Sequence, residues 1–220
     1  MSTVAVRLSR AWVEASSARA GQEVVDAVVR AAHHQPRAVP PLLRPNPGLA
    51  QAESSWGETV VQAASHLGHR QLLLELARDG VALDLFAACA IGDKSLARSM
   101  LSSGSLDACG IHSLPLLHFG VMSRDISVLR MLVDANVAPN PPHASLSALH
   151  SAVAIGSAAM IPLLIAAGVS TTAVDASFGA TPYDWALKVG TPSSEIMDML
   201  QVDRDSIRFR AADGALRSSD

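Results

Sequence analysis

The pattern of apolar and small residues in this chain repeats about every 32 positions. The segment "LLHFGVMSRDISVLRMLVDANV" (residues 116–137) aligns without gaps with "ALHSAVAIGSAAMIPLLIAAGV" (residues 148–169), so that His118 falls on His150. Residues 84–105 align at the same offset. A period of roughly 20 to 50 residues is typical of arrays in which each unit buries its apolar face on its neighbours. The repeat therefore predicts a stack of similar units.

Each repeat is predicted to fold as two short helices joined by a tight turn. Its first half is rich in small residues, and its second half carries apolar residues at helical spacing. Gly68, Gly92 and Gly156 separate the halves, as a left-handed turn requires, and Arg124 takes this place in one unit. A second Gly or Asn ends each second helix. Residues 59–81 share this spacing between their two glycines.

The segment from Ala135 to Val174 contains no Lys, Arg, Asp or Glu, which raises the question of a membrane span. About 20 apolar residues are enough to cross a bilayer. However, Gly156 and Pro162 interrupt the segment, and no aromatic belt or basic cluster flanks it. We expect two short helices with a break near Gly156, and no association with a membrane.

Composition narrows the class of protein further. The 220 residues carry a net charge of −3, without the basic excess typical of nucleic-acid binding, so no nucleic acid is expected as a partner. Apolar residues make up 49% and aromatic residues only 4%, which favours packed helices rich in Ala and Leu. Two cysteines, Cys89 and Cys109, do not make a disulfide framework. The amino terminus has no secretory signal, and a cytoplasmic location is expected.

The stretches "TVVQAASHLGH", "SALHSAVAIGS" and "TPYDWALKVG" share an opening pattern. They resemble the T-P-L-H-x-A-A-x-x-G-H pattern of the ankyrin-repeat protein family. The resemblance implies an all-α fold, a helical repeat solenoid of ankyrin-like helix–turn–helix units with short β-turn loops. It covers residues 58–201 in about four to five units. Because only 24 residues separate Gly68 from Gly92, residues 58–80 are interpreted as an added helical hairpin.

The segments on either side of this array are predicted to differ from it. Residues 1–57 are expected to hold a pair of helices, within residues 6–34, followed by a proline-rich strap. The strap, residues 35–48, is expected to be a loop or an extended segment because proline interrupts helices. Residues 202–220 are expected to form a polar carboxy-terminal tail.

The eight histidines of the chain are candidate metal ligands. The resemblance gives His118 and His150 a structural role, as rings that hydrogen-bond in the turn. His66 and His69 lie three positions apart, but the sequence contains neither a Cys-x-x-Cys nor a His-Glu-x-x-His motif. No metal, no cofactor and no catalytic residue are therefore expected.

The resemblance also implies a binding surface built from the first helices and the loop tips. Exposed apolar side chains there would mark a partner site, with aromatic residues as anchors. We expect a non-catalytic module that binds another protein on an apolar concave groove. The residues expected to make this contact are Phe119, Met122, Ser151, Ile155, Trp185 and Lys188 on the helices, with His112, His143 and Phe178 at the loop tips. The alternative is that some of these side chains pack on neighbouring helices and are not exposed for binding.

Two other functions stay open. The same groove could hold a hydrophobic small molecule, as a binding protein or an enzyme, with residues 35–48 as a lid and Cys109, His112 and His143 at the rim. A Cys–His pair can be catalytic, but an isolated loop cysteine is more typical of an inert residue. No paired carboxylates are visible, which favours protein binding. The apolar faces could also join two copies of the chain as a homodimer.

Overall fold

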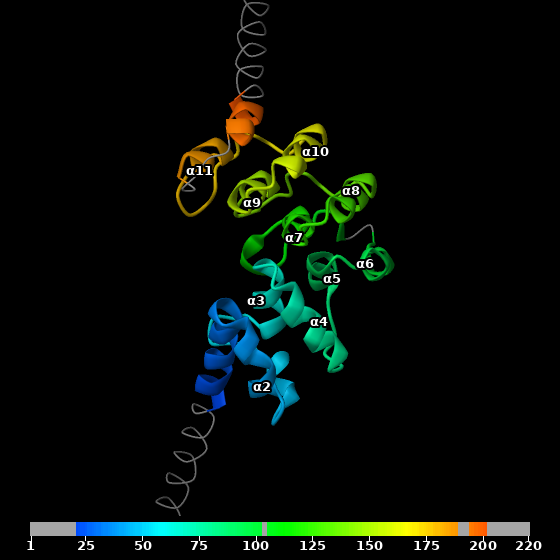
Figure 1. The fold of residues 1–220 in the computed structure, drawn as a ribbon, viewed down its shortest axis with the longest axis vertical. Coiled ribbons are helices and arrows are strands. Elements are labelled where there is room, and N and C mark those ends of the chain that lie inside the picture. Colours follow the sequence, from blue (N-terminus) through cyan, green and yellow to red (C-terminus); the bar gives the residue numbers. More distant parts are fainter. Residues whose placement is uncertain (1–20, 103–104, 189–193, 202–220) are drawn as a thin grey trace, which may run out of the picture. The chain divides into compact units, whose positions relative to one another are not determined.

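The computed structural model describes residues 21–102, 105–188 and 194–201 (Figure 1). Every regular element in these residues is a helix and none is a β-strand, which confirms the all-α prediction. The chain divides into two compact units, Met1–Leu83 and Asp84–Asp220. In the described ranges, no helix is long and apolar enough to cross a membrane.

The first unit contains a helix over residues 21–34, whose buried face includes Val28, Val29 and Ala32. The elements that follow are η1 Pro36–Ala38, α2 Val39–Leu43, η2 Pro47–Ala50, α3 Val60–His66 and α4 Arg70–Arg78. α4 packs against α2 and α3, and α3 also packs against η2. Leu73, on α4, is completely buried in this small core.

The proline-rich segment folds differently from its prediction. The sequence predicts a loop or an extended strap over residues 35–48, but this segment contains η1, α2 and the start of η2. In each of these helices a proline occupies one of the first two positions, where the helix does not use its missing N–H. The prolines therefore begin short helices here instead of preventing them.

The division between the units lies after α4, whereas the sequence places the start of the repeat array at residue 58, before α3. α3 and α4 form two helices joined through Gly68, and they group with the first unit. A capping box at Thr59 and Gln62 begins α3. The first 20 residues of the predicted amino-terminal segment and the whole predicted tail, residues 202–220, lie outside the described residues.

The second unit is built from short helices in pairs. Its elements are α5 Leu85–Ile91, α6 Lys94–Met100, η4 Ile111–Ser113, α7 Leu116–Met122, α8 Ile126–Asp134, α9 Ala148–Ala154, η5 Ala158–Met160, α10 Ile161–Ala166 and α11 Pro182–Lys188, with a further helix over residues 194–201. Within pairs, α5 packs on α6, α7 on α8 and α9 on α10. Between pairs, α5 packs on α7, α7 on α9 and α9 on α11, and Figure 1 shows these first helices following one another in a row.

The pairs recur as the sequence period predicts. The first helices begin at Leu85, Leu116, Ala148 and Pro182, and each covers seven residues. The uncharged stretch forms α9 and α10, with a left-handed break at Gly156, as predicted. Most of the apolar side chains at helical spacing are completely buried between the pairs, among them Leu117, Val128, Leu129, Leu132, Leu149, Ile161 and Leu164. The helical periodicity therefore identified the core correctly.

Arg124 holds the turn between α7 and α8 with a left-handed φ of 58°, where Gly68, Gly92 and Gly156 stand at the matching turns. A Cβ atom is strained in this region. We expect Arg124→Gly to raise the free energy of unfolding by about 0.5–1 kcal/mol, because the strain released exceeds the entropy that glycine adds to the unfolded chain. Urea unfolding measures the change. Arg130→Gly, on the exposed face of α8, is the control and should lose about 1 kcal/mol. A loss of stability in both variants would contradict the inference that the backbone of Arg124 is strained.

Candidate functional site

Three loops of the second unit are joined to one another by backbone hydrogen bonds. They cover residues 107–115, 140–147 and 170–181, and we call them together the loop-tip row. The N–H of Ser145 donates to the carbonyl of Ser113 at 2.9 Å, and the N–H of Ala176 donates to the carbonyl of Ser145 at 2.8 Å. Each loop is thus tied to the next by a backbone hydrogen bond, and Oδ1 of Asn140 also accepts from the N–H of Ser170 at 2.9 Å.

Asp175 shapes the last loop of this row. Its Oδ1 accepts hydrogen bonds from the N–H groups of Ser177 (2.9 Å) and Phe178 (2.7 Å). Its Oδ2 accepts from the N–H of Ala180 (3.1 Å) and from the indole Nε1–H of Trp185 (3.0 Å). One carboxylate therefore fixes the loop and also the ring of Trp185 on α11.

The environment of Asp175 favours its ionised form. Burial is the largest single influence and raises the pKa of the carboxyl group. The hydrogen bonds from Trp185 and from the backbone of the loop together outweigh burial, and they lower the pKa from 3.8 to about 2. The loop conformation is therefore coupled to the negative charge of this side chain.

The residues predicted at the loop tips are exposed. Phe178 leaves 75% of its surface open to solvent, and His112 and His143 are also exposed, both with left-handed backbones. Lys188, at the end of α11, is exposed as predicted. Sequence reasoning did not identify two further exposed apolar side chains near Phe178 in the chain, Val174 and Leu187.

The prediction of an exposed groove across α7 and α9 is wrong at several positions. Phe119 is only 1% exposed, because its ring packs on Phe86, with the ring centroids 4.9 Å apart. Ser151 is buried against the preceding helix pair, where its Oγ lies within hydrogen-bond distance, 2.7 Å, of Nδ1 of His118. Ser123, at the end of α7, is also buried, and its hydroxyl donates to the carbonyl of Gly120. These side chains form contacts between helices and do not line a binding surface.

The other predicted groove residues are half-buried: Met122, Ile155 and Trp185. Ile155 and Trp185 pack against the core of the second unit. Packing between neighbouring helices, the alternative to an exposed groove, accounts for these two side chains. The exposed part of the predicted surface is accordingly the loop-tip row and the end of α11.

His150 forms hydrogen bonds within the fold, as the resemblance to ankyrin repeats implies. Its ring is fully buried at the start of α9. Nε2 lies 2.9 Å from the carbonyl of Ala180, so this nitrogen carries the proton, and Nδ1 accepts from the N–H of Ser147 at 3.1 Å. Burial lowers the pKa of His150, although the hydrogen bond to the carbonyl of Ala180 and the charges of nearby aspartates oppose the shift. The neutral ring thus joins α9 to the loop that precedes α11.

The two cysteines are poor nucleophiles. Burial raises the pKa of the Cys89 thiol to about 12, and the charge of Asp84 adds to this. Burial also raises the pKa of Cys109, together with the charge of Asp107. The thiolate is the reactive form, and both sites disfavour it.

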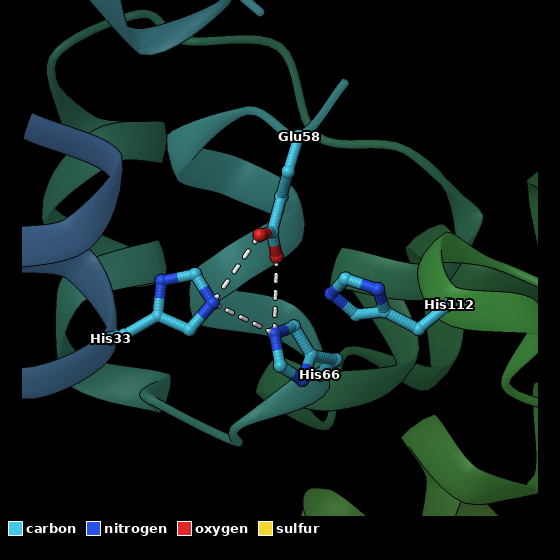
Figure 2. Close-up of side chains that lie close together, drawn as sticks. All are labelled: His33, Glu58, His66 and His112. Atoms are coloured by element: carbon cyan, nitrogen blue, oxygen red, sulfur yellow. Dashed lines mark hydrogen bonds and ion pairs between the residues drawn. The ribbon is translucent and has the colours of Figure 1, made fainter. Parts of the chain in front are cut away.

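The first unit contains a cluster of two histidines and a glutamate that sequence reasoning did not identify. His33 lies at the end of the helix over residues 21–34, Glu58 precedes α3, and His66 is the last residue of α3. Figure 2 shows the carboxylate of Glu58 pointing toward the rings of His33 and His66. His112, also drawn there, belongs to the second unit and has been described with it.

The atoms of this cluster lie close together. Nε2 of His66 lies 3.1 Å from Oε1 of Glu58. Nε2 of His33 lies 3.3 Å from Oε2 of Glu58, and the two Nε2 atoms are 3.3 Å apart. The Glu58 side chain is only 1% exposed. Burial is the largest influence and raises its pKa, but hydrogen bonds from His66 and Trp56 and the charges of both histidines lower it to about 2. Glu58 is therefore a buried carboxylate, and imidazole and carboxylate are side chains that can hold a metal ion.

No signal in the sequence marks this cluster. His33 and His66 are 33 positions apart, and no short motif links either of them to Glu58. The fold brings them together because the helix over residues 21–34 lies beside α3 in the first unit, where Nε2 of His69 also lies 3.2 Å from the carbonyl of His33.

Comparison with protein-family models finds no match for this chain, and comparison with curated proteins finds none either. The likeness to ankyrin repeats consequently stays a prediction from the residues.

Proposed function

We propose that the second unit is a non-catalytic recognition module, similar to ankyrin-repeat proteins, that binds another protein through the loop-tip row. The observation that carries this proposal is the pair of backbone hydrogen bonds that joins the three loops, at Ser113, Ser145 and Ala176. Loops held on a rigid helical scaffold are the usual carriers of recognition. The regular pairs of short helices and the buried ring of His150 also support the ankyrin-like reading.

Phe178 is the residue we expect to contribute most to partner binding. Its side chain is 75% exposed, yet its backbone N–H is held by Asp175. Large aromatic side chains dominate binding free energies, and a residue already held in place loses less conformational entropy when it binds. His112 and His143 would then provide hydrogen bonds from the neighbouring loops.

The other two functions have less support. A small molecule bound in an apolar groove would need Phe119 and Ser151 to be accessible, and both are buried. Pairing of two copies would use the same exposed side chains, and it is a possible result of the following experiment rather than a separate proposal.

The test is to identify the partner with the full chain as bait and then to measure its affinity for variants. We expect Phe178→Asp to weaken binding at least about 10-fold, because the anchor is replaced by a charge. Ile126→Asp is the matched control: Ile126 is an exposed apolar residue at the start of α8, outside the loop-tip row, and this variant should bind like the wild type. Circular dichroism verifies that both variants are folded. Equal affinities for both variants, or a homodimer as the only complex, would refute the proposal.

A further inference from the structure

We propose that His33, Glu58 and His66 form a binding site for a divalent transition-metal ion of the zinc type. All three side chains belong to the first unit, so this inference does not depend on the recognition function proposed for the second unit. The argument rests on the distances between the three side chains, on the hydrogen bonds that orient them, and on the burial of the carboxylate.

The spacing of the three groups fits one metal ion. Zinc bonds to imidazole nitrogen and carboxylate oxygen are about 2.0–2.1 Å long, which places neighbouring ligand atoms of a tetrahedral site roughly 3.3 Å apart. The distances among His33 Nε2, His66 Nε2 and the Glu58 oxygens are 3.3, 3.3 and 3.1 Å. The two imidazole nitrogens thus lie at the separation of neighbouring ligands of one ion, and the carboxylate of Glu58 faces each of them through a different oxygen.

The tautomer of His33 makes its Nε2 a suitable ligand. Nδ1 of His33 lies 2.9 Å from the carbonyl of Val29, and because a carbonyl only accepts, Nδ1 carries the proton. In the neutral ring, Nε2 then directs a lone pair toward the carboxylate of Glu58 at 3.3 Å. A metal ion bound at this position would accept the lone pair and lie next to the carboxylate. Metal-bound histidines commonly donate their other N–H to a backbone carbonyl in this way.

The carboxylate and the backbone of the site are also held in place. The indole Nε1–H of Trp56 donates to Oε2 of Glu58 at 2.8 Å. Nε2 of His69 lies 3.2 Å from the carbonyl of His33, and it must be the donor, which restrains the end of that helix. Outer hydrogen bonds of this kind orient metal ligands and strengthen metal binding.

The ligand set and its exposure indicate the class of ion. Two imidazoles and one carboxylate suit Zn²⁺, Co²⁺, Ni²⁺ or Cu²⁺, whereas Mg²⁺ and Ca²⁺ prefer sites built from oxygen alone. The side chains of His33 and His66 are 20% and 13% exposed, so an ion can reach the site. Three protein ligands leave a fourth position of a tetrahedral ion open to water or another donor.

Co²⁺ binding to the full chain tests the proposal, because tetrahedral Co²⁺ has strong visible absorption. After treatment with a chelator, the protein is titrated with Co²⁺, and Zn²⁺ is then added to displace it. We expect one equivalent of tetrahedral Co²⁺ and its displacement by Zn²⁺. The double variant H33A/H66A should bind at least about 100-fold more weakly, since even loss of an outer hydrogen bond costs 10- to 100-fold.

The matched control is the double variant H34A/H143N, which leaves the same number of histidines in the chain. His34 and His143 are both exposed, so this variant should bind Co²⁺ like the wild type. Glu58→Gln keeps the shape of the side chain and should bind at least about 10-fold more weakly, which provides a second variant if H33A/H66A does not fold. Phe178→Asp should bind the metal normally, and this separates the metal site from the recognition surface.

Two results would overturn the proposal. One is a wild-type protein whose Co²⁺ binding does not exceed that of H33A/H66A. The other is saturable binding that persists in Glu58→Gln and H33A/H66A but is lost in H34A/H143N, which would place the ion elsewhere. In either case the hydrogen bonds and close contacts among these side chains would account for the cluster.

Discussion

Replacing His150 by alanine is expected to lower the free energy of unfolding of the second unit by about 3 kcal/mol. The buried ring uses both of its nitrogens, one to donate to the carbonyl of Ala180 and one to accept from the N–H of Ser147. It also lies edge-on to Trp185, with the ring centroids 5.2 Å apart. Alanine would leave two buried backbone groups without these partners and would open a cavity between α9 and the loop before α11.

Chemical unfolding followed by circular dichroism measures this loss. His143→Asn is the control, because His143 is exposed and its left-handed φ of 66° suits asparagine. We expect its effect to stay within about 0.5 kcal/mol. If both histidine variants lost the same small amount of stability, the connection through His150 would not be an important source of stability.

The helices of the second unit could be predicted because their pattern is local. The spacing of apolar residues along α8 and α10, and the glycines between helices, depend on a few neighbouring positions. The role of His150 was implied by the resemblance to ankyrin repeats. The break at Gly156 followed from the same pattern, since a left-handed turn is required between the two helices.

Burial across the helix pairs could not be predicted in the same way. Phe119 was placed on an exposed face by its register, but its exposure depends on Phe86 in the preceding pair. Ser151 is likewise buried by His118, which the neighbouring pair provides. A register identifies the face on which a residue lies, but the size of the side chains opposite determines whether that face is open to solvent.

The cluster in the first unit shows a second limit of sequence reasoning. His33, Glu58 and His66 come from a helix end, a loop and another helix end, and they meet only through the packing of the first unit. The short helices of the proline-rich segment were missed for a different reason. Proline is expected to interrupt helices, but in the first turn it is well tolerated, and η1, α2 and η2 all use it there.

Replacing Asp175 by asparagine is expected to lower the free energy of unfolding by about 2–3 kcal/mol at neutral pH. The substitution keeps an oxygen that can accept from Ser177 and Phe178, but the amide NH₂ would face the N–H groups of Ala180 and Trp185. The N–H groups of Ala180 and Trp185 would then face another donor instead of an acceptor. The negative charge that strengthens all four hydrogen bonds would also be lost. Because this loop carries Phe178, we also expect weaker partner binding.

The pH dependence of this effect follows from the pKa of Asp175. Hydrogen bonds lower this pKa from 3.8 to about 2, against the opposing influence of burial. The wild-type protein therefore gains stability from the ionised carboxylate above pH 4, and this gain disappears as the pH falls toward 2. The difference between wild type and Asp175→Asn should consequently shrink over the same range in urea unfolding experiments. Asp134→Asn, at an exposed position on α8, is the control and should change stability by less than about 0.5 kcal/mol at every pH. A difference for Asp175→Asn that stayed constant down to pH 2 would mean that the loop is held by the shape of this side chain and not by its charge.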